Sequence, residues 1–198
     1  AADLVRAAAT YGVAPEVIVA IIGVETRYGS NMGSYRVIDA LATLAFDYPP
    51  RSEFFAGELE QFLVMVREQG FDPLSLRGSY AGAMGMGQFI PSSFRAYAVD
   101  FDGDGHADIW NSRTDAIGSV ANYFKRHGWE YGAPVVLPAR VVGPVVKERM
   151  NPGLEPDVAV SELAALGIAA DGTIDATERV LPLMLDTDAG RSEEHTSE

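Results

Sequence analysis

The chain has 198 residues, of which 47% are hydrophobic and 22% charged, which is typical of a globular protein of one sizeable domain or slightly more. A net charge of −13 argues against a nucleic-acid-binding surface, which needs clustered lysine and arginine. The absence of cysteine excludes disulfides and cysteine-ligated metals. No apolar stretch has the length of a membrane span, and the first residues lack a signal-peptide pattern. We therefore expect a mature piece or a fragment of a longer precursor.

Apolar periodicity, proline and glycine predict a mainly helical chain up to residue 132. Proline in a first turn, as at Pro15, and glycine after a last residue, as at Gly12, are typical of helix ends. The expected helices are Leu4–Tyr11, Pro15–Thr26, one around Val37–Leu44 that stops at Pro49–Pro50, one capped by Ser52 and closed by Gly70, Pro91–Val99, and Asp115–His127. The glycine-rich run Gly78–Gly87, before the helix at Pro91, should be a loop or tight turn.

The pattern changes at Ala133. Short runs that favour β structure, separated by proline and glycine, follow at Val135–Leu137, Val141–Val142, Val145–Val146 and Arg179–Leu185, with a small helix over Ser161–Leu166. We therefore expect a helical core at residues 1–132 and a small β-rich region at residues 133–190. The polar end RSEEHTSE, residues 191–198, follows an unfinished strand pattern and is interpreted as a non-native tail.

The segment DFDGDGHAD, at Asp100–Asp108, has the spacing of an EF-hand calcium loop. With Asp100 at the first position, Asp102 and Asp104 fall at the third and fifth, and glycine falls at the sixth, where the loop turns sharply. His106, at the seventh position, would offer its backbone carbonyl. Because calcium is a hard cation that binds several oxygens, these residues predict a cation site.

The closing ligand departs from the EF-hand pattern. The twelfth position is Asn111, where glutamate is usual, and the next carboxylate is Asp115 at the start of a helix, which could close a longer loop. An acidic surface turn without a metal and a regulatory or dockerin-like EF-hand are the alternatives. Since only one such loop is present, we expect a structural ion that fixes the loop to the following helix.

A lone glutamate ends the most apolar helix of the sequence. In PEVIVAIIGVETRYGSN, the eight residues before Glu25 are apolar except for one glycine. We therefore expect a largely buried helix, which would raise the pKa of the Glu25 carboxyl and suit a general acid near neutral pH. The alternative is a helix-end glutamate that pairs with Arg27 or faces water.

The glycine-rich run Gly78–Phe94, GSYAGAMGMGQFIPSSF, combines small residues with Met84, Gln88 and Phe89. Glycine lets the backbone approach a ligand closely, and the Gln88 amide can donate to and accept from a sugar hydroxyl or acetamido group. Met84 and Phe89 would supply an apolar wall for a sugar. A tightly packed interhelical turn is the alternative interpretation.

Three motifs occur in one order along the chain. They are E-T-R-Y-G from Glu25, G-A-M-G-M-G-Q-F-I-P-S from Gly82, and D-F-D-G-D-G-H from Asp100, the last followed by D-A-I-G-S-V-A-N-Y-F-K-R-H-G-W. Together they resemble the membrane-bound lytic murein transglycosylase B family of the lysozyme-like superfamily, from about Val13 to Trp129. The resemblance implies a lysozyme-like helical core, an EF-hand-like calcium site and an inserted small β domain.

The resemblance also implies roles for particular positions. Glu25 matches the catalytic acid and base of the family. Ser79 and Gln88 match residues that contact the glycan. Tyr123 matches an aromatic residue of the cleft, and Arg51 matches a cleft arginine. Met84, proposed above as part of the apolar wall, is the fifth expected substrate-binding residue. The residues that match calcium ligands are Asp100, Asp102, Asp104, His106 and Asp115.

The implied reaction is cleavage of the β-1,4 bond between N-acetylmuramic acid and N-acetylglucosamine in peptidoglycan. Because no second motif-borne carboxylate accompanies Glu25, we expect a substrate-assisted route. Glu25 would protonate the leaving oxygen, the muramyl N-acetyl group would stabilise the anomeric carbon, and Glu25 would then deprotonate the muramyl C6 hydroxyl, whose attack gives a 1,6-anhydro end. The alternatives are a hydrolysing muramidase, an inactive or truncated peptidoglycan-binding module and a calcium sensor.

Peptidoglycan glycan strands are the expected partner, with structural calcium as the expected ion and neither nucleic acid nor an organic cofactor. We expect a monomer in the periplasm, attached to the outer membrane in its full-length form through an N-terminus missing here. The family has helical sequence before Ala1 and an aromatic-rich helical segment after Gly190 that line the same cleft.

Overall fold

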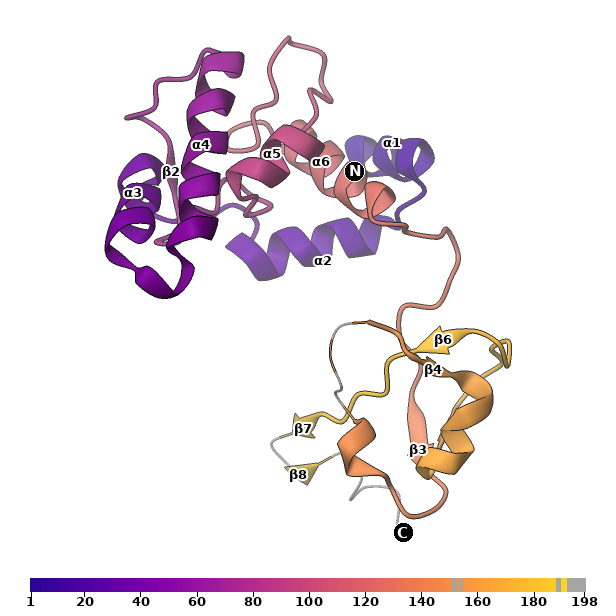
Figure 1. Ribbon diagram of the computed structural model, residues 1–198. Coiled ribbons are helices and arrows are strands. Elements are labelled where there is room, and N and C mark those ends of the chain that lie inside the picture. The colour runs from indigo at the N-terminus through magenta and orange to yellow at the C-terminus, as the bar shows by residue number, and fades with distance from the viewer. Residues whose placement is uncertain (151–152, 154, 188–189, 192–198) are drawn as a thin grey trace. The chain divides into compact units, whose positions relative to one another are not determined.

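The computed structural model describes residues 1–150, 153, 155–187 and 190–191. It divides into two compact units, residues 1–132 (unit 1) and the residues from 133 onward (unit 2). Figure 1 shows mainly helices and loops in unit 1, and short strands with short coiled segments in unit 2. The expected non-native tail, residues 191–198, lies outside the described residues except for Arg191. Within the described residues no single helix could cross a membrane, although α1 and α2, bent by 112°, pass that test together by length and composition.

Unit 1 is mainly helical, as the sequence predicts. Its helices are α1 (Ala2–Tyr11), α2 (Pro15–Thr26), α3 (Val37–Asp47), α4 (Ser52–Gln69), α5 (Pro91–Tyr97) and α6 (Arg113–Arg126), with the 3-10 turn η1 (Pro49–Arg51) before α4. The two-residue strands β1 (Tyr35–Arg36) and β2 (Arg77–Gly78) pair in antiparallel fashion. The predicted mainly helical class is therefore confirmed, with helix ends displaced by a few residues.

Helix ends follow local chemistry. Gly12 ends α1 in the left-handed conformation, as predicted. The predicted cap Ser52 is wrong, because η1 runs directly into α4 and leaves Arg51 in the cap position without a side-chain hydrogen bond. Ser112 caps α6 instead, and its hydroxyl accepts the Asp115 amide at 3.2 Å. This cap fixes the start of the helix next to the acidic loop.

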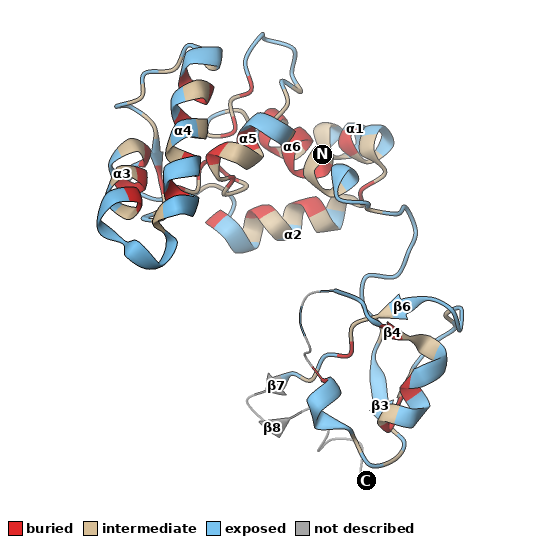
Figure 2. Ribbon diagram, in the orientation of Figure 1, coloured by how far each residue is buried: buried red, intermediate tan, exposed pale blue. Residues whose placement is uncertain are grey.

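The core of unit 1 lies between packed helix pairs: α3 with α4, α4 with α5, and α1 with α6. Leu41 of α3, Phe62 of α4 and Val120 of α6 are almost entirely buried. Figure 2 shows buried residues along one side of these helices and exposed residues along the other. Each such side chain stabilises the fold by roughly 1.5–3 kcal/mol. The packed helices form the scaffold that carries the end of α2 and the glycine-rich turn.

Unit 2 has its own small core of Met150, Val158, Leu163 and Ile168. Its antiparallel pairs are β3 (Ala139–Val141) with β5 (Ile168–Ala170), β4 (Val158–Ala159) with β6 (Arg179–Val180), and β7 (Asp186–Thr187) with β8 (Gly190–Arg191), together with the 3-10 turns η2 (Lys147–Arg149) and η3 (Val160–Leu166).

The strands of unit 2 are shorter than the sequence predicts. The predicted strands Val135–Leu137 and Val145–Val146 are wrong, and only the first two residues of Arg179–Leu185 are in a strand. Prolines stand beside these runs, at Pro134, Pro138 and Pro144. Because proline lacks an amide hydrogen and cannot donate to a ladder, extended segments next to it often stay unpaired.

Candidate functional site

The end of α2 carries Glu25, but α2 is less buried than its composition suggests. Its buried residues Ile18, Ile22 and Thr26 are spaced four apart and form one stripe. Glu25 lies beside this stripe and is exposed, and Val24 is 82% exposed. The expected burial of Glu25 is therefore wrong, because only one face of this apolar helix is covered by the described residues.

Glu25 nevertheless lines a cavity of about 330 Å³ in unit 1. The walls come from α2, the glycine-rich turn, α5 and α6. The lining side chains that carry polar groups are Glu25, Gln88, Ser93 and Tyr123, and the remaining lining residues are Ile21, Gly87, Phe89, Ile90, Val120 and Phe124. Among the described residues of this lining, no second carboxylate accompanies Glu25. A single carboxyl group beside apolar and aromatic walls can exchange a proton with a bound ligand.

The glycine-rich turn is folded by its own backbone and presents Gln88 to the cavity. Met84 and Phe89 exchange two backbone hydrogen bonds of 2.9 Å. Gln88 adopts a left-handed conformation with φ of 52°, and its Nε2 donates to the Gly85 carbonyl at 3.0 Å. Gly85 has φ of 67°, and a Cβ there would lie 2.5 Å from Ile109. The turn therefore requires glycine at this position to hold Gln88 in place.

Tyr123 forms part of an aromatic wall. Its ring centroid lies 5.7 Å from that of Phe89 and 5.1 Å from that of Tyr97. The His127 ring stacks on it at 4.0 Å, and His127 Nδ1 lies 2.8 Å from the Tyr123 carbonyl oxygen. These contacts on several sides fix the ring, which makes it a rigid part of the cavity wall.

Three predicted substrate contacts do not line this cavity. Met84 is wrong as a sugar-facing residue, because its side chain is completely buried in the core. The Ser79 hydroxyl accepts the Ala83 amide at 3.0 Å, within its own turn. The Arg51 guanidinium is exposed and lies 4.4 Å from the centroid of the Phe54 ring. The cavity therefore brings together Glu25, Gln88 and Tyr123 from the predicted set, but neither Ser79 nor Arg51.

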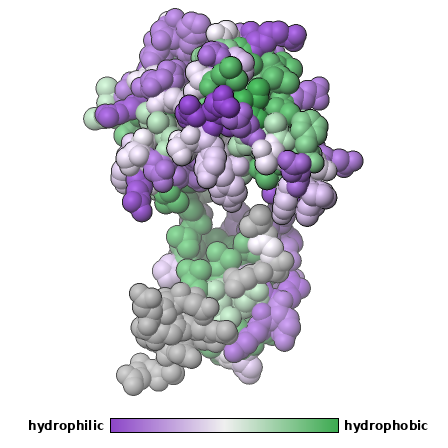
Figure 3. Space-filling view, turned by 90° about the vertical axis from the view of Figure 1, so that its left-hand side faces the viewer, coloured by the Kyte–Doolittle hydropathy of each residue, from purple (hydrophilic) through white to green (hydrophobic). Residues whose placement is uncertain are grey.

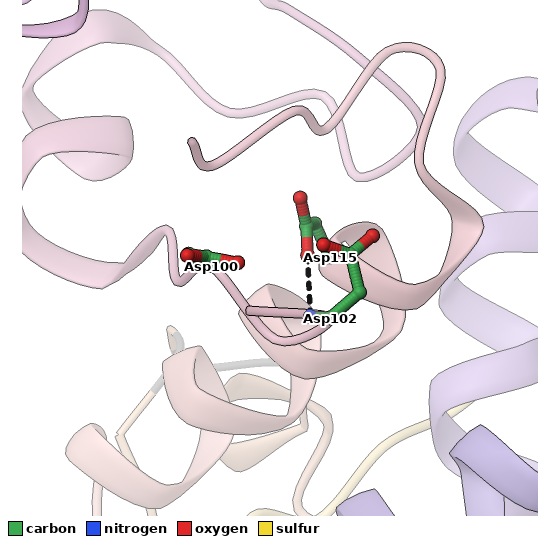
Figure 4. A group of neighbouring side chains, drawn as sticks. All are labelled: Asp100, Asp102 and Asp115. Atoms are coloured by element: carbon green, nitrogen blue, oxygen red, sulfur yellow. Dashed lines mark hydrogen bonds between the residues drawn. The ribbon is translucent and has the colours of Figure 1, made fainter. Parts of the chain in front are cut away.

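The acidic loop folds back onto the start of α6. Asp115 is fully buried, and its carboxylate accepts backbone hydrogen bonds from Phe101 at 2.7 Å, Asp102 at 3.1 Å and Asp108 at 2.9 Å. Burial raises the pKa of the Asp115 carboxyl, against the lowering effect of these amides. Carboxylate oxygens of Asp100, Asp102 and Asp115 lie within 4.8 Å of one another (Figure 4). Such a group of oxygens suits a hard cation.

One predicted calcium ligand, Asp104, stands apart from this group. The carboxylate of Asp104 accepts the amide of His106 at 2.9 Å and does not converge with the other three. The Asp100 carboxylate accepts the Gly105 amide at 2.8 Å, and this bond is the main reason why the pKa of Asp100 is lowered. The loop thus favours the charged form of Asp100 and keeps its carboxylate near those of Asp102 and Asp115.

The profile of the family described as "Transglycosylase SLT domain" matches residues 1–194. The chain belongs to this family. The resemblance of the three motifs to lytic murein transglycosylases is therefore confirmed, and the cavity with Glu25 and Gln88 lies in the part of the chain that matches the SLT domain profile.

Known relatives agree with this assignment. The membrane-bound lytic murein transglycosylase B of Escherichia coli (strain K12) is 51% identical over 185 residues, which cover 93% of this chain and 50% of that protein. The soluble lytic transglycosylase SltB1 from Pseudomonas aeruginosa matches with a TM-score of 0.90 and 55% identity, over 96% of this chain and 63% of that chain. The Escherichia coli lytic transglycosylase Slt35 in complex with calcium matches with a TM-score of 0.82 and 50% identity, over 96% and 59%. The chain thus spans about half the length of the curated relative.

Several cavity residues of this SLT-domain chain were not singled out from the sequence. Ile21 precedes Glu25 by four residues, so helical spacing alone places both on one face of α2. The same spacing relates Val120 to Phe124 on α6. No local signal marks Ser93, because only the packing of α5 turns its side chain toward the cavity.

Proposed function

We propose that this chain carries the catalytic core of a lytic transglycosylase that cleaves the β-1,4 bond between N-acetylmuramic acid and N-acetylglucosamine in peptidoglycan and leaves 1,6-anhydromuramyl ends. The observation that carries the proposal is the shared cavity of Glu25 and Gln88, with its aromatic and apolar walls. The lytic transglycosylase relatives, at 50% identity or more, support the same chemistry. Because the chain spans only about half the length of the curated relative, the glycan-cleaving activity of the whole relative is carried over to this chain as a proposal.

Glu25 is proposed as the only acid and base. With no second carboxylate among the described lining residues, the muramyl N-acetyl group stabilises the anomeric carbon after Glu25 protonates the leaving oxygen. The ionised Glu25 then takes the proton of the muramyl C6 hydroxyl. Gln88 and Tyr123 hold the sugar, and Ser79 and Arg51 are proposed to contact the glycan outside the cavity.

Mass spectrometry of purified sacculi after digestion tests this function. The chain should release fragments whose muramyl ends are one water lighter than hydrolysed ends, and Glu25→Gln should abolish them. Glu16→Gln is the matched control, because Glu16 is exposed in the first turn of the same helix. Reducing muramyl ends would identify a hydrolysing muramidase, and sacculus binding without release would identify a glycan-binding module.

The acidic loop is proposed to hold a structural calcium ion. The fit rests on the convergence of Asp100, Asp102 and Asp115 and on the calcium complex of the relative Slt35. Asp104 and His106 stay proposed ligands on their EF-hand positions. The ion would neutralise the converging carboxylates and tie the loop to α6, which also carries Tyr123.

The proposed location is the periplasm, where peptidoglycan lies, with the full-length form at the outer membrane; the relative named as membrane-bound supports attachment to a membrane. On the face that Figure 3 shows, hydrophilic residues are interspersed with smaller hydrophobic areas on unit 1. We also propose that the protein is a monomer and that its reaction needs no organic cofactor. The proposed division is a catalytic core at residues 1–132 and a β-rich region at residues 133–190.

A further inference from the structure

Thr26, the residue after Glu25, joins three parts of the site and is only 1% exposed. Its hydroxyl oxygen lies 3.0 Å from the carbonyl oxygen of Ile22, one turn earlier in α2, and 3.0 Å from that of Met86 in the glycine-rich turn, so its proton is shared between two acceptors. The same oxygen accepts the Gly29 amide at 3.0 Å. One side chain therefore connects α2, the turn that carries Gln88, and the segment that leaves α2.

The segment that leaves α2 has an unfavourable backbone. Arg27 and Tyr28 adopt left-handed conformations, with φ of 51° and 61°, and Gly29 follows with φ of 84°. Residues with a Cβ rarely adopt this region, and they stay there only where surrounding contacts hold them. The Thr26 hydroxyl holds the turn at Gly29, and the Thr26 carbonyl accepts the Asn31 amide at 2.9 Å.

We propose that Thr26 is a positioning residue of the glycan-cleaving reaction, which fixes the Glu25 carboxyl relative to the turn that presents Gln88. This inference rests on the proposed function. The Thr26 side chain is buried and does not line the cavity, so its removal acts on the placement of Glu25 and leaves the sugar-contacting surface in place. Displacement of a catalytic group by about 1 Å slows a reaction by roughly a hundredfold.

Three substitutions separate the hydroxyl from its surroundings. Thr26→Val removes the hydroxyl and keeps the branched shape, whereas Thr26→Ser keeps the hydroxyl. Thr10→Val is the matched control, because the exposed Thr10 hydroxyl also bonds the carbonyl four residues earlier, at Arg6, but makes no hydrogen bond to another element within the described residues. With sacculi as substrate, Thr26→Val should lower kcat by about tenfold or more and leave KM within about twofold. Thr26→Ser should restore most of the rate, and Thr10→Val should match the unaltered chain.

Two results overturn the inference while the proposed function stands: a folded Thr26→Val chain with an unaltered kcat, or equal losses in the valine and serine variants. Should Thr26→Val fail to fold, as judged by circular dichroism at the assay temperature, Thr26→Ala against Thr26→Ser provides the same comparison. If the unaltered chain releases no anhydro fragments, the proposed function fails and this inference fails with it. That outcome is recognised from the unaltered chain alone.

Discussion

The carboxyl group of Glu58, buried in α4, accepts the backbone amide of Ser92 at 2.9 Å and thereby caps the first turn of the neighbouring α5. The cap position of α5 itself is occupied by Ile90, whose side chain cannot accept a hydrogen bond. The first amides of a helix have no partner within it, so the cap from α4 satisfies one of them. Because Ile90 and Ser93 line the cavity, Glu58 sets the position of one cavity wall.

Removal of this cap should destabilise unit 1. Glu58→Ala leaves the Ser92 amide without its acceptor in a half-buried position, and we expect the free energy of unfolding to fall by about 1–3 kcal/mol. Glu58→Gln keeps an oxygen acceptor and should lose less. Urea unfolding measures both, with Glu60→Ala, an exposed change on the same helix, as the control. Equal stabilities of the Glu58→Ala and Glu60→Ala chains would contradict the role of the cap.

Ser93 and Ser92 are neighbours with different surroundings, since only Ser93 lines the cavity. If the Ser93 hydroxyl bonds the glycan, Ser93→Ala should raise KM on sacculi by about two- to tenfold, the effect of one hydrogen bond. Ser92→Ala should leave KM unchanged, because the Glu58 cap bonds the Ser92 backbone and does not need its side chain. Steady-state kinetics of the pair decides, and a larger effect of Ser92→Ala would count against Ser93 as a contact.

Substitutions of Met84 distinguish a packing role in the core from contact with the substrate. Because its side chain is completely buried, Met84→Ala should cost about 2–5 kcal/mol of unfolding free energy. Met84→Leu nearly conserves the volume and should cost less than about 1.5 kcal/mol. Thermal unfolding gives the stabilities, and KM for sacculi should be the same in the unaltered and the leucine chains. A leucine variant of normal stability with a strongly raised KM would restore the sugar-facing interpretation.

The helices of unit 1 were predictable because their signals are local. Pro15 and Gly12 mark helix ends through their own backbone preferences, and the spacing of apolar residues marks the helical period. The same local information could not predict the exposure of Glu25. The apolar run before it shows that a helix can be buried, but which faces are covered depends on neighbours that are distant in sequence.

The contacts that shape the site are long-range and leave no pattern in the sequence. Thr26 bonds Met86, 60 residues later, and Glu58 bonds Ser92, 34 residues later. Each involves a backbone group, which every residue has, so no residue type at the second position marks the partner. The motif resemblance identified Glu25, Gln88 and Tyr123 as candidate site residues, whereas the residues that hold them had to be found in three dimensions.

Substitutions in the acidic loop should lower the unfolding free energy in two different ways. In the unaltered chain, calcium at about a hundred times its Kd should add about 2.7 kcal/mol to the unfolding free energy. Asp100→Asn should remove that gain and lower the calcium-free stability less than Asp115→Asn does, because Asp100 is exposed although its carboxylate accepts the Gly105 amide. Asp115→Asn should lower stability with and without calcium, since the buried Asp115 carboxylate accepts three backbone amides that an amide side chain cannot fully satisfy.

Substitution of Asp104 tests whether the loop binds calcium with all of its EF-hand carboxylates. If Asp104 turns inward as a ligand when calcium binds, Asp104→Asn should weaken calcium binding in isothermal titration as strongly as Asp102→Asn does. If the three convergent carboxylates suffice, only Asp102→Asn should have that effect. Asp47→Asn, an exposed change at the end of α3, controls for the loss of net negative charge. Calcium-independent thermal unfolding of the unaltered chain would exclude the structural ion altogether, because a ligand that binds only the folded state must stabilise it.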